Sequence, residues 1–279
     1  MVPLFLSQVL DTLISVRFRR LDYSMSALGS QHTIELEPID EQLVASLSDE
    51  LLHLASSFSL TLDDAAAQLC VEHLLYVQQI NSYMNLTRIT DVHEALTLHI
   101  LDSLALAQIL PSNPTRFLDM GTGAGFPGIP FHVLTRSSGV LLDSVGKKIA
   151  AVNACIKQLG LKEIIGVHAR LEEFALKESH SFDVVLARAV GQLPLLLEYG
   201  TPFLSDDGYL VLAKAFPSED ERSSGLKAAS LCGLNLLDVF EFDLPGDLGH
   251  RSIFLFRKVK EPSVRLPRPV GIAKKNPLG

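Results

Sequence analysis

A glycine-rich turn is the feature of this sequence with the clearest chemical potential. The run Gly121-Thr-Gly-Ala-Gly-Phe-Pro-Gly128 directly follows a short apolar stretch at residues 117–120 that contains Asp119. Glycines let a backbone turn tightly and approach a ligand, and open α/β sheets bind ligands beyond the carboxyl ends of their strands. We therefore expect Gly121, Gly123 and Gly125 to lie against a bound small molecule.

The spacing of this turn differs from that of a dinucleotide site. Such a site has the pattern GxGxxG, whereas Phe126 stands here in place of the third glycine. Phe126 and Pro127 add apolar bulk and remove an amide donor where a pyrophosphate would bind. Asp143 lies close to the expected spacing, about 20 residues on, at which a carboxylate accepts hydrogen bonds from ribose. The pattern favours S-adenosylmethionine over NAD, and a turn without a ligand remains an alternative.

Alternating strands and helices would position this turn. Strands are expected at residues 117–120, 139–143, 164–168, 183–187 and 209–213, with helices through Leu134 and at about 147–159. Two later runs, near 234–240 and 252–256, should pair as an antiparallel hairpin because only a short loop joins them. The fold class predicted is α/β, with a doubly wound, Rossmann-like parallel sheet.

A helical pattern precedes the sheet. From about Asp40 to Leu110, apolar residues recur every three or four positions, and Thr61 with Asp64 resembles a capping box. Pro111 and Pro114 mark a boundary. We expect a disordered or mis-annotated extension at 1–38, a helical domain at 39–112, the main domain at 113–260 and a basic tail at 261–279.

Composition narrows the class of protein. The 279 residues are 47% hydrophobic and 20% charged, which excludes collagen-like, coiled-coil and disordered chains. Three widely spaced cysteines support neither a disulfide framework nor a zinc site, so we expect no metal and a reducing, cytoplasmic location. The apolar start is a poor signal peptide and too short to span a bilayer.

The net charge of −8 is unevenly distributed. Residues 31–110 carry Arg88 alone against twelve acidic residues, whereas residues 257–279 carry seven basic residues against Glu261. A polyanion is repelled by the first of these segments and attracted by the second. A nucleic acid partner should therefore contact the end of the chain and avoid residues 31–110.

The glycine run also supports a family resemblance. Residues 117–130, followed by Leu142-Asp-Ser144 and Lys147-Lys148, resemble the bacterial 16S ribosomal RNA guanine-N7 methyltransferase family, also called glucose-inhibited division protein B. Further matching segments are Asn85-Leu-Thr87, His99-Ile-Leu-Asp-Ser-Leu104, Arg170-Leu-Glu-Glu-Phe174, Ala187-Arg-Ala189, Lys214 and Gly271-Ile-Ala-Lys-Lys275. The sequence departs from the family pattern at Ile80, Ser82, Leu98 and Asn276.

The resemblance implies a class I S-adenosylmethionine-dependent methyltransferase behind a small helical domain, acting on one guanosine of 16S ribosomal RNA as a monomer. The cofactor pocket would comprise Gly121, Gly123, Gly125, Phe126, Asp143, Leu171, Glu172 and Arg188. Substrate contacts are expected from Asn85, His99, Arg170, Arg251, Lys274 and Lys275.

The missing motifs constrain the reaction. No Asn/Asp-Pro-Pro-aromatic loop is present for amine methylation, and no cysteine lies in an expected strand-end loop for attack on a pyrimidine. Guanine N7 carries an exposed lone pair, so alignment with the methyl donor suffices. We expect no general base, and positioning by Arg188 and Lys214. Methylation of another RNA, a protein or a small molecule, and a non-enzymatic role in ribosome assembly, remain alternatives.

Overall fold

The computed structural model describes residues 34–188 and 191–279, and Ile34–Gly279 forms one compact unit. The extension expected at residues 1–38 lies outside the described residues up to position 33. Residues 34–38 are described and form neither helix nor strand.

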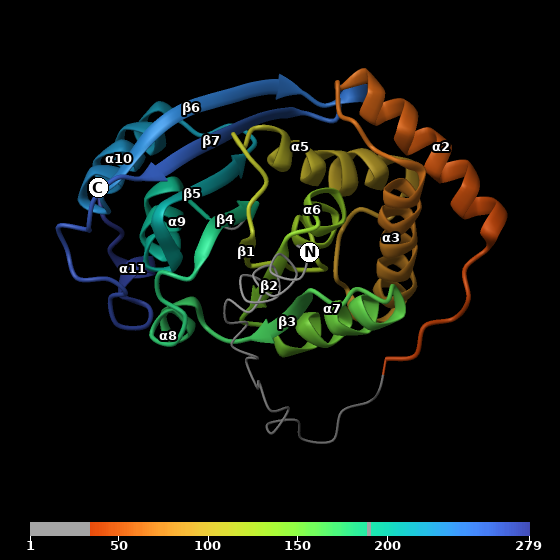
Figure 1. Ribbon diagram of the computed structural model, residues 1–279, viewed down its shortest axis with the longest axis horizontal. Helices are drawn as coiled ribbons and strands as arrows, with labels where there is room; N and C mark the ends of the chain where they lie inside the picture. The colour runs from red at the N-terminus through yellow and green to blue at the C-terminus, as the bar shows by residue number, and fades with distance from the viewer. Residues whose placement is uncertain (1–33, 189–190) are drawn as a thin grey trace, which may run out of the picture. The chain divides into compact units, whose positions relative to one another are not determined.

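A seven-stranded sheet runs through this unit in the order β3-β2-β1-β4-β5-β7-β6 (Figure 1). The strands are β1 (Arg116–Met120), β2 (Ser138–Asp143), β3 (Ile164–His168), β4 (Phe182–Arg188), β5 (Leu204–Lys214), β6 (Leu234–Asp243) and β7 (His250–Lys258). β1 to β5 are parallel, and β7 pairs antiparallel with both β5 and β6. The strand order reverses between β1 and β4, where α/β sheets open a ligand crevice at the carboxyl ends of the strands.

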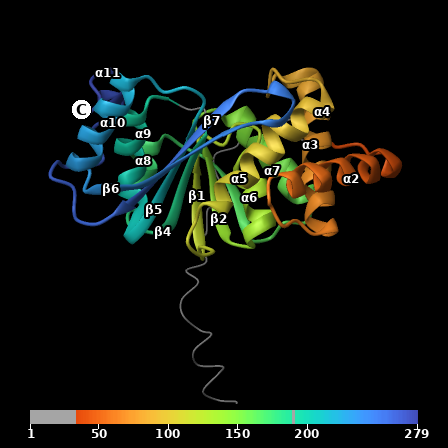
Figure 2. The same cartoon turned by 90° about the horizontal axis from the view of Figure 1, so that it is seen from above.

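Helices cover both faces of the sheet (Figure 2). On one side lie α6 (Gly128–Thr135) and α7 (Gly146–Gln158), and on the other lie α8 (Leu171–Ala175), α9 (Leu193–Gly200) and α10 (Glu219–Leu231). Short helical turns at Thr201–Phe203 and Pro245–Asp247 and the last helix, α11 (Ile272–Lys275), complete this part of the chain. Burial on both faces explains why the central strands read as nearly continuous apolar runs.

The N-terminal helices form an additional layer beside α6 and α7. They are α2 (Glu41–Ser57), α3 (Asp64–Met84), α4 (Val92–Ala95), a π-helical turn at Leu96–Leu101 and α5 (Asp102–Gln108). Asp63 caps α3 by accepting a hydrogen bond from the Ala66 amide at 2.7 Å. The capping box predicted at Thr61 is therefore wrong, because the neighbouring carboxylate reaches the amide instead.

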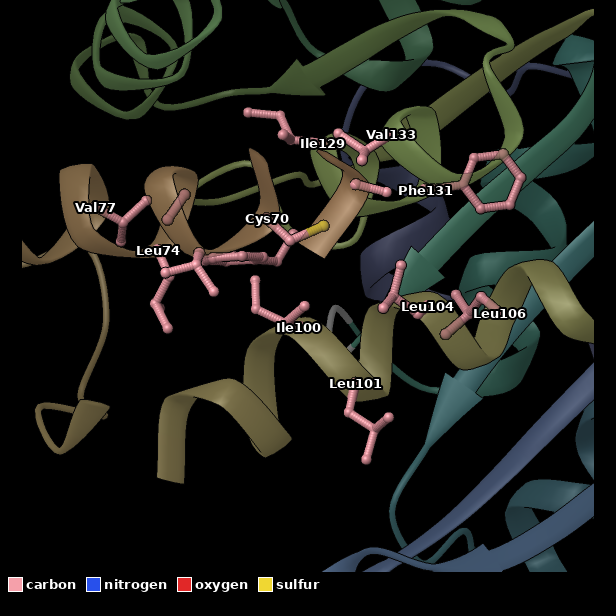
Figure 3. Packing of buried hydrophobic residues seen from close by; sticks show 14 of the residues in the cluster. Cys70, Leu74, Val77, Ile100, Leu101, Leu104, Leu106, Ile129, Phe131 and Val133 are labelled. Carbon is pink, nitrogen blue, oxygen red and sulfur yellow. The ribbon is translucent and has the colours of Figure 1, made fainter. Parts of the chain in front are cut away.

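The apolar faces of α3, α5 and α6 meet in a shared core (Figure 3). Cys70 and Leu74 of α3 point toward Ile100 and Leu104 from the π-helical turn and α5, and Ile129 of α6 lies above them. All five side chains are at most 1% exposed. The helical layer is thus packed directly against the helix that follows the glycine turn.

The α/β fold class with a preceding helical part is confirmed, and each of the seven expected strands is present. The late hairpin is also antiparallel, as predicted. A membrane-crossing helix is not found within residues 34–188 and 191–279, since none there has the length and apolar character it would need.

Candidate active site

A cleft of about 340 Å³ lies at the carboxyl ends of β1, β4 and β5. Its lining comes from the loop after α3, the π-helical turn, the glycine turn and the start of β7. The lining residues are Leu86, Thr87, Ile89, Leu98, His99, Asp102, Gly121, Thr122, Gly123, Ala124, Phe126, Arg188, Ala213, Lys214, Ala215 and Arg251.

The glycine turn adopts a backbone path that favours glycine at three positions. Gly121, Gly123 and Gly125 have φ angles of 74°, 61° and 96°, in the left-handed region that other residues rarely adopt. The Gly121 amide donates to the carbonyl of Leu142 on β2 at 2.8 Å. This bond ties the turn to the neighbouring strand, so its position relative to the cleft is fixed.

Oδ1 of Asp119 and Oγ1 of Thr122 are buried beside this turn, and the Thr122 hydroxyl is directed at the Asp119 carboxylate. The other carboxylate oxygen of Asp119 accepts from the Gly128 amide at 2.9 Å. Burial raises the pKa of Asp119 to about 6. Asp119 is fully buried and does not line the cleft, so it holds the turn, whereas Thr122 lines the cleft.

Asp143 ends β2 and holds the glycine turn from the other side. Its Oδ2 accepts from the Gly123 amide at 3.1 Å, and its Oδ1 accepts from the Val145 amide at 2.9 Å. A carboxylate has about four lone-pair positions, so two remain for ligand hydroxyls. Asp143 therefore supports the turn, in addition to the ribose contact expected from its position.

Two histidines from the helical layer enclose Phe126. The His99 ring stacks on it at 4.6 Å between centroids, and the His73 ring lies at 4.4 Å with a tilt of 41°. His73 Nε2 donates to the carbonyl of Ala124 in the glycine turn at 3.0 Å. The three rings connect α3 and the π-helical turn to the ligand side of the cleft.

His99 is held neutral by its neighbours. A guanidinium nitrogen of Arg188 lies 3.5 Å from Nδ1, and since a guanidinium only donates, Nδ1 presents its lone pair. Nε2 therefore carries the hydrogen and donates to Oγ1 of Thr87 at 2.9 Å. Burial first, and then the charge of Arg188, lower the pKa of His99 to about 3.

Asp102 lies between two arginines of the sheet. Its Oδ2 is 3.0 Å from Nη1 of Arg188 on β4, and its Oδ1 is 3.0 Å from Nε of Arg251 on β7. Nη1 of Arg188 also donates to the carbonyl of Leu98 at 2.6 Å. The Asp102 side chain is 3% exposed, and the two cations leave this group with one net positive charge facing the cleft.

Lys214 ends β5 at the opposite wall. Its ammonium forms an ion pair with Glu221 of α10 at 2.9 Å and donates to the carbonyl of Gly191. Lys214 therefore lines the cleft as expected while being anchored to two neighbouring segments.

Comparison with known proteins decides the family. A family model described as rRNA small subunit methyltransferase G matches residues 66–247. The ribosomal RNA small subunit methyltransferase G of Acetivibrio thermocellus is 36% identical over 82% of this chain and 95% of its own length. The protein of that name from Desulfitobacterium hafniense is 39% identical over 71% of this chain and 83% of its own length.

The chain belongs to the rRNA small subunit methyltransferase G family. Among solved structures, a putative methyltransferase from Bacillus halodurans is 15% identical, covers 57% of this chain and 100% of its own, and gives a TM-score of 0.48.

In this member of the rRNA small subunit methyltransferase G family, the segment matched by the family model contains most of the residues that line the cleft. Of the residues expected to bind ligand or position it, the cleft brings together Gly121, Gly123, Phe126, His99, Arg188, Lys214 and Arg251. Gly125 and Asp143 do not line the cleft but stabilise its glycine turn. Gly125 belongs to this turn, and Asp143 accepts a hydrogen bond from the Gly123 amide.

Six other expected residues lie outside the cleft lining. Asn85 follows α3 and Arg170 precedes α8, both exposed, and Leu171 begins α8. Glu172 is buried, and its Oε1 accepts from the Gly271 amide at 2.9 Å. Lys274 and Lys275 are exposed on α11, which contacts α9. The C-terminal segment thus contacts Glu172, one of the residues expected in the cofactor pocket.

Sequence reasoning did not single out Asp102, Thr87, His73 and Asn81. Asp102 and Thr87 line the cleft, and His73 holds the glycine turn. Asn81 accepts from the amides of Leu86 and Thr87 at 2.6 and 2.9 Å and so shapes the loop beside His99. Asp102 and Thr87 lie inside segments that resemble the family, so the sequence offered a reason to consider them. Nothing in the sequence marked His73 or Asn81 as functional.

A larger cavity of about 580 Å³ lies among α2, α3 and the end of α7. Four carboxylates line it, from Glu41, Asp49, Asp64 and Glu72. Because this lining repels a polyanion and lies away from the glycine turn, we assign the chemistry to the smaller cleft.

The described residues contain one group of potential metal ligands, His180, Asp206 and Glu261. The ammonium of Lys258 lies 2.9 Å from Nδ1 of His180, 3.3 Å from Asp206 and 3.0 Å from Glu261. The ligand atoms are therefore already occupied by a cation that belongs to the fold.

Proposed function

We propose that this protein transfers the methyl group of S-adenosylmethionine to N7 of a specific guanosine in 16S ribosomal RNA of the small subunit. Family membership supports the reaction class. The observation that carries the proposal further is the cleft itself, in which the glycine turn and two guanidinium groups meet without a free general base among the described lining residues.

The glycine turn fits the proposed cofactor. The Thr122 hydroxyl, which lines the cleft, would bond to the amino acid group, and Asp143 would accept from ribose. Gly121 and Gly123 would allow close approach, and Phe126 stands where a dinucleotide site has its third glycine. When bound, S-adenosylmethionine supplies a methyl group on a positively charged sulfur.

His99 and Asp102 in the cleft are poorly suited to accepting a proton, which favours methylation at N7 over methylation of an exocyclic amine. The pKa of His99 is lowered to about 3, and its lone pair faces Arg188. Both oxygens of Asp102 are paired with arginines. An N7 lone pair attacks without losing a proton, so alignment is all that the protein has to provide.

The cations would supply that alignment. Arginine donates bidentately to the O6 and N7 edge of guanine or to phosphate. If Arg188 donates to O6, N7 remains free to face the methyl group. Arg251, fixed by the same Asp102, would then hold the phosphate beside the target nucleotide.

The product nucleoside tests this proposal. Unmodified 16S RNA and small subunits would each be incubated with the protein and labelled S-adenosylmethionine, digested to nucleosides and separated by chromatography. We expect the label in 7-methylguanosine, from one position of the RNA. Label in another nucleoside, in a ribosomal protein or in neither fraction would overturn the proposal and indicate one of the alternatives.

Cofactor choice is tested separately by calorimetric titration. S-adenosylmethionine and its demethylated product should both bind, and NAD should not. Binding of NAD without binding of S-adenosylmethionine would exclude the assigned cofactor.

We also propose that the protein acts as a cytoplasmic monomer. Its three cysteines are free and buried, in keeping with a reducing compartment. The division into a helical domain at 39–112, a catalytic domain at 113–260 and a basic tail at 261–279 stays part of this proposal.

A further inference from the structure

An exposed aromatic ring lies beside the cleft without a role in the fold. Phe216 follows the cleft-lining residues Lys214 and Ala215, and 78% of its surface is exposed. Its ring stacks on the imidazole of His250 with centroids 5.1 Å apart and planes 21° apart. A single exposed apolar residue is ordinary, but this one is ordered against a second ring at the rim of a functional site.

The sheet explains the position of this pair. β5 and β7 are antiparallel with Lys214 opposite Ser252, and continuing that register by two residues places Phe216 opposite His250. Nδ1 of His250 lies 2.8 Å from a carboxylate oxygen of Asp243 on β6. The His250 ring is therefore held by its own strand, by Asp243 and by its stack with Phe216, while the Phe216 ring faces solvent.

Phe216 and His250 do not line the cleft themselves, but Lys214, which lies two residues before Phe216 on the same face of the strand, does. The neighbouring residues Ala215 and Arg251 also line the cleft, from the opposite face of the sheet. An RNA that places a guanine in the cleft must pull that base out of its stack, which exposes the adjacent bases. An aromatic ring with a free face restores the lost stacking and accepts any base, because every base has a π-face.

We propose that Phe216, supported by His250, is a stacking platform for an unpaired nucleobase of the substrate RNA next to the methylated guanosine. This inference rests on the proposed function and adds a substrate contact to it. The occupant is a base because an aromatic ring with a free face stacks on any nucleobase, and because this ring lies two residues after Lys214 in the cleft proposed to hold the target nucleotide.

The chain has no tryptophan, so Phe216→Trp introduces a single fluorescent reporter. The probe is protein-free 16S RNA made by transcription. We expect the emission of Phe216→Trp to be quenched as this RNA is added, because the indole stacks on a base. Leu176→Trp is the matched control, since Leu176 is 75% exposed and lies next to α8, away from the cleft lining. Its emission should stay unchanged.

Binding measurements complete the test. Phe216→Ala should weaken binding of the transcript by roughly 5- to 150-fold, the range for loss of one stacked base. The salt dependence should not change because no charge is removed, and binding of S-adenosylmethionine should match wild type. Leu176→Ala should bind RNA like wild type. Wild-type affinity in Phe216→Ala, or no quenching in Phe216→Trp, would overturn the platform while leaving the methyltransferase assignment intact. If wild-type protein fails to methylate RNA, the proposed function fails instead.

Discussion

The imidazole of His99 and the ring of Phe126 lie parallel, with centroids 4.6 Å apart and planes 7° apart. One ring comes from the π-helical turn before α5 and the other from the glycine turn after β1. The stack therefore joins the helical layer to the ligand side of the cleft. Protonating His99 would place a second positive charge beside Arg188, whose guanidinium lies 3.5 Å away.

Stability should fall as the pH falls below about 6.5. Burial lowers the pKa of His73 to about 4 and that of His99 to about 3. The unfolded chain then binds more protons than the folded chain, so each contribution is present above pH 6.5 and is lost as the pH falls through the folded pKa. The loss at pH 5 is about 2 kcal/mol for each histidine.

The titration of Asp119 changes the stability of the fold in the opposite direction as the pH falls. Its pKa is raised to about 6, so acidification through that value stabilises the fold by about 1 kcal/mol at pH 5. Urea unfolding at pH 7.5 and 5.0 measures the net change. His99→Phe keeps a ring for the stack and removes one titrating group, so its stability should depend less on pH. An identical pH dependence in this variant would contradict the assignment.

Arg188→Ala should impair methyl transfer far more than folding. Asp102 keeps Arg251 as its ion-pair partner, so the buried carboxylate is not left without a cation. Loss of a charge-assisted bond to the base or cofactor costs about 2–3 kcal/mol, which is a rate loss of roughly 30- to 150-fold. Single-turnover methylation with saturating cofactor measures it. Arg188→Lys is a useful comparison because it keeps the charge without the forked donors. A folded Arg188→Ala protein with the wild-type rate would remove this residue from the site.

Two glycines of the same loop should respond differently to alanine. A Cβ at Gly128 would lie 2.7 Å from both Oδ2 of Asp119 and Cγ of Leu141, whereas a Cβ at Gly123 meets no protein atom within 4 Å. Gly128→Ala should therefore destabilise the fold by about 1–3 kcal/mol through overpacking. Gly123→Ala carries only the strain of its positive φ, about 1–2 kcal/mol, and fills part of the cleft.

Thermal unfolding and cofactor titration separate these two effects. Gly123→Ala should remain folded and bind S-adenosylmethionine more weakly. If Gly123→Ala binds the cofactor like wild type, the ligand does not approach this turn.

The two lysines of α11 should contribute to RNA binding through charge. The segment is anchored independently of them, because Arg268 lies 2.5 Å from the buried Glu198 and the Gly271 amide bonds to Glu172. Lys274→Gln with Lys275→Gln should therefore leave the fold intact and make the slope of log affinity against log salt shallower by about 1–2. Deleting residues 261–279 is a poorer test because it would leave Glu198 unpaired.

Lys157→Gln with Lys162→Gln is the matched control for this charge change. Lys157 ends α7 and Lys162 precedes β3, both exposed at the amino edge of the sheet. This pair should leave the salt slope unchanged. Equal slopes in both double variants would show that α11 does not contact RNA.

The features that a sequence encodes locally were predictable here. The strand runs, the glycine turn and the carboxylate of Asp143 are local patterns, and the structure places them together. Glu172 was expected from the family resemblance and is found under Gly271, a residue 99 positions later. No local pattern indicates that contact.

Long-range packing explains the residues that were missed. His73 reaches the glycine turn only because α3 packs against α6, and Ala124 is 51 residues away in sequence. In the sequence, Asp102 is one acidic residue among others in a helical pattern. Only the packing of β4 and β7 brings an arginine to each of its two oxygens. Part of the cleft lining, including His99 and Asp102, therefore comes from the helical layer, whose negative charge suggested that it would avoid RNA.

The shared carboxylate of Asp102 makes the two ligand sides of the cleft interdependent. If an RNA phosphate drew Arg251 away, Asp102 would be left to Arg188 alone, and a ligand bound by Arg188 would be affected. Thermodynamic linkage is reciprocal, so the bound cofactor must alter RNA affinity by the same factor. The affinities for the two substrates would thus depend on how one carboxylate is shared between two guanidinium groups.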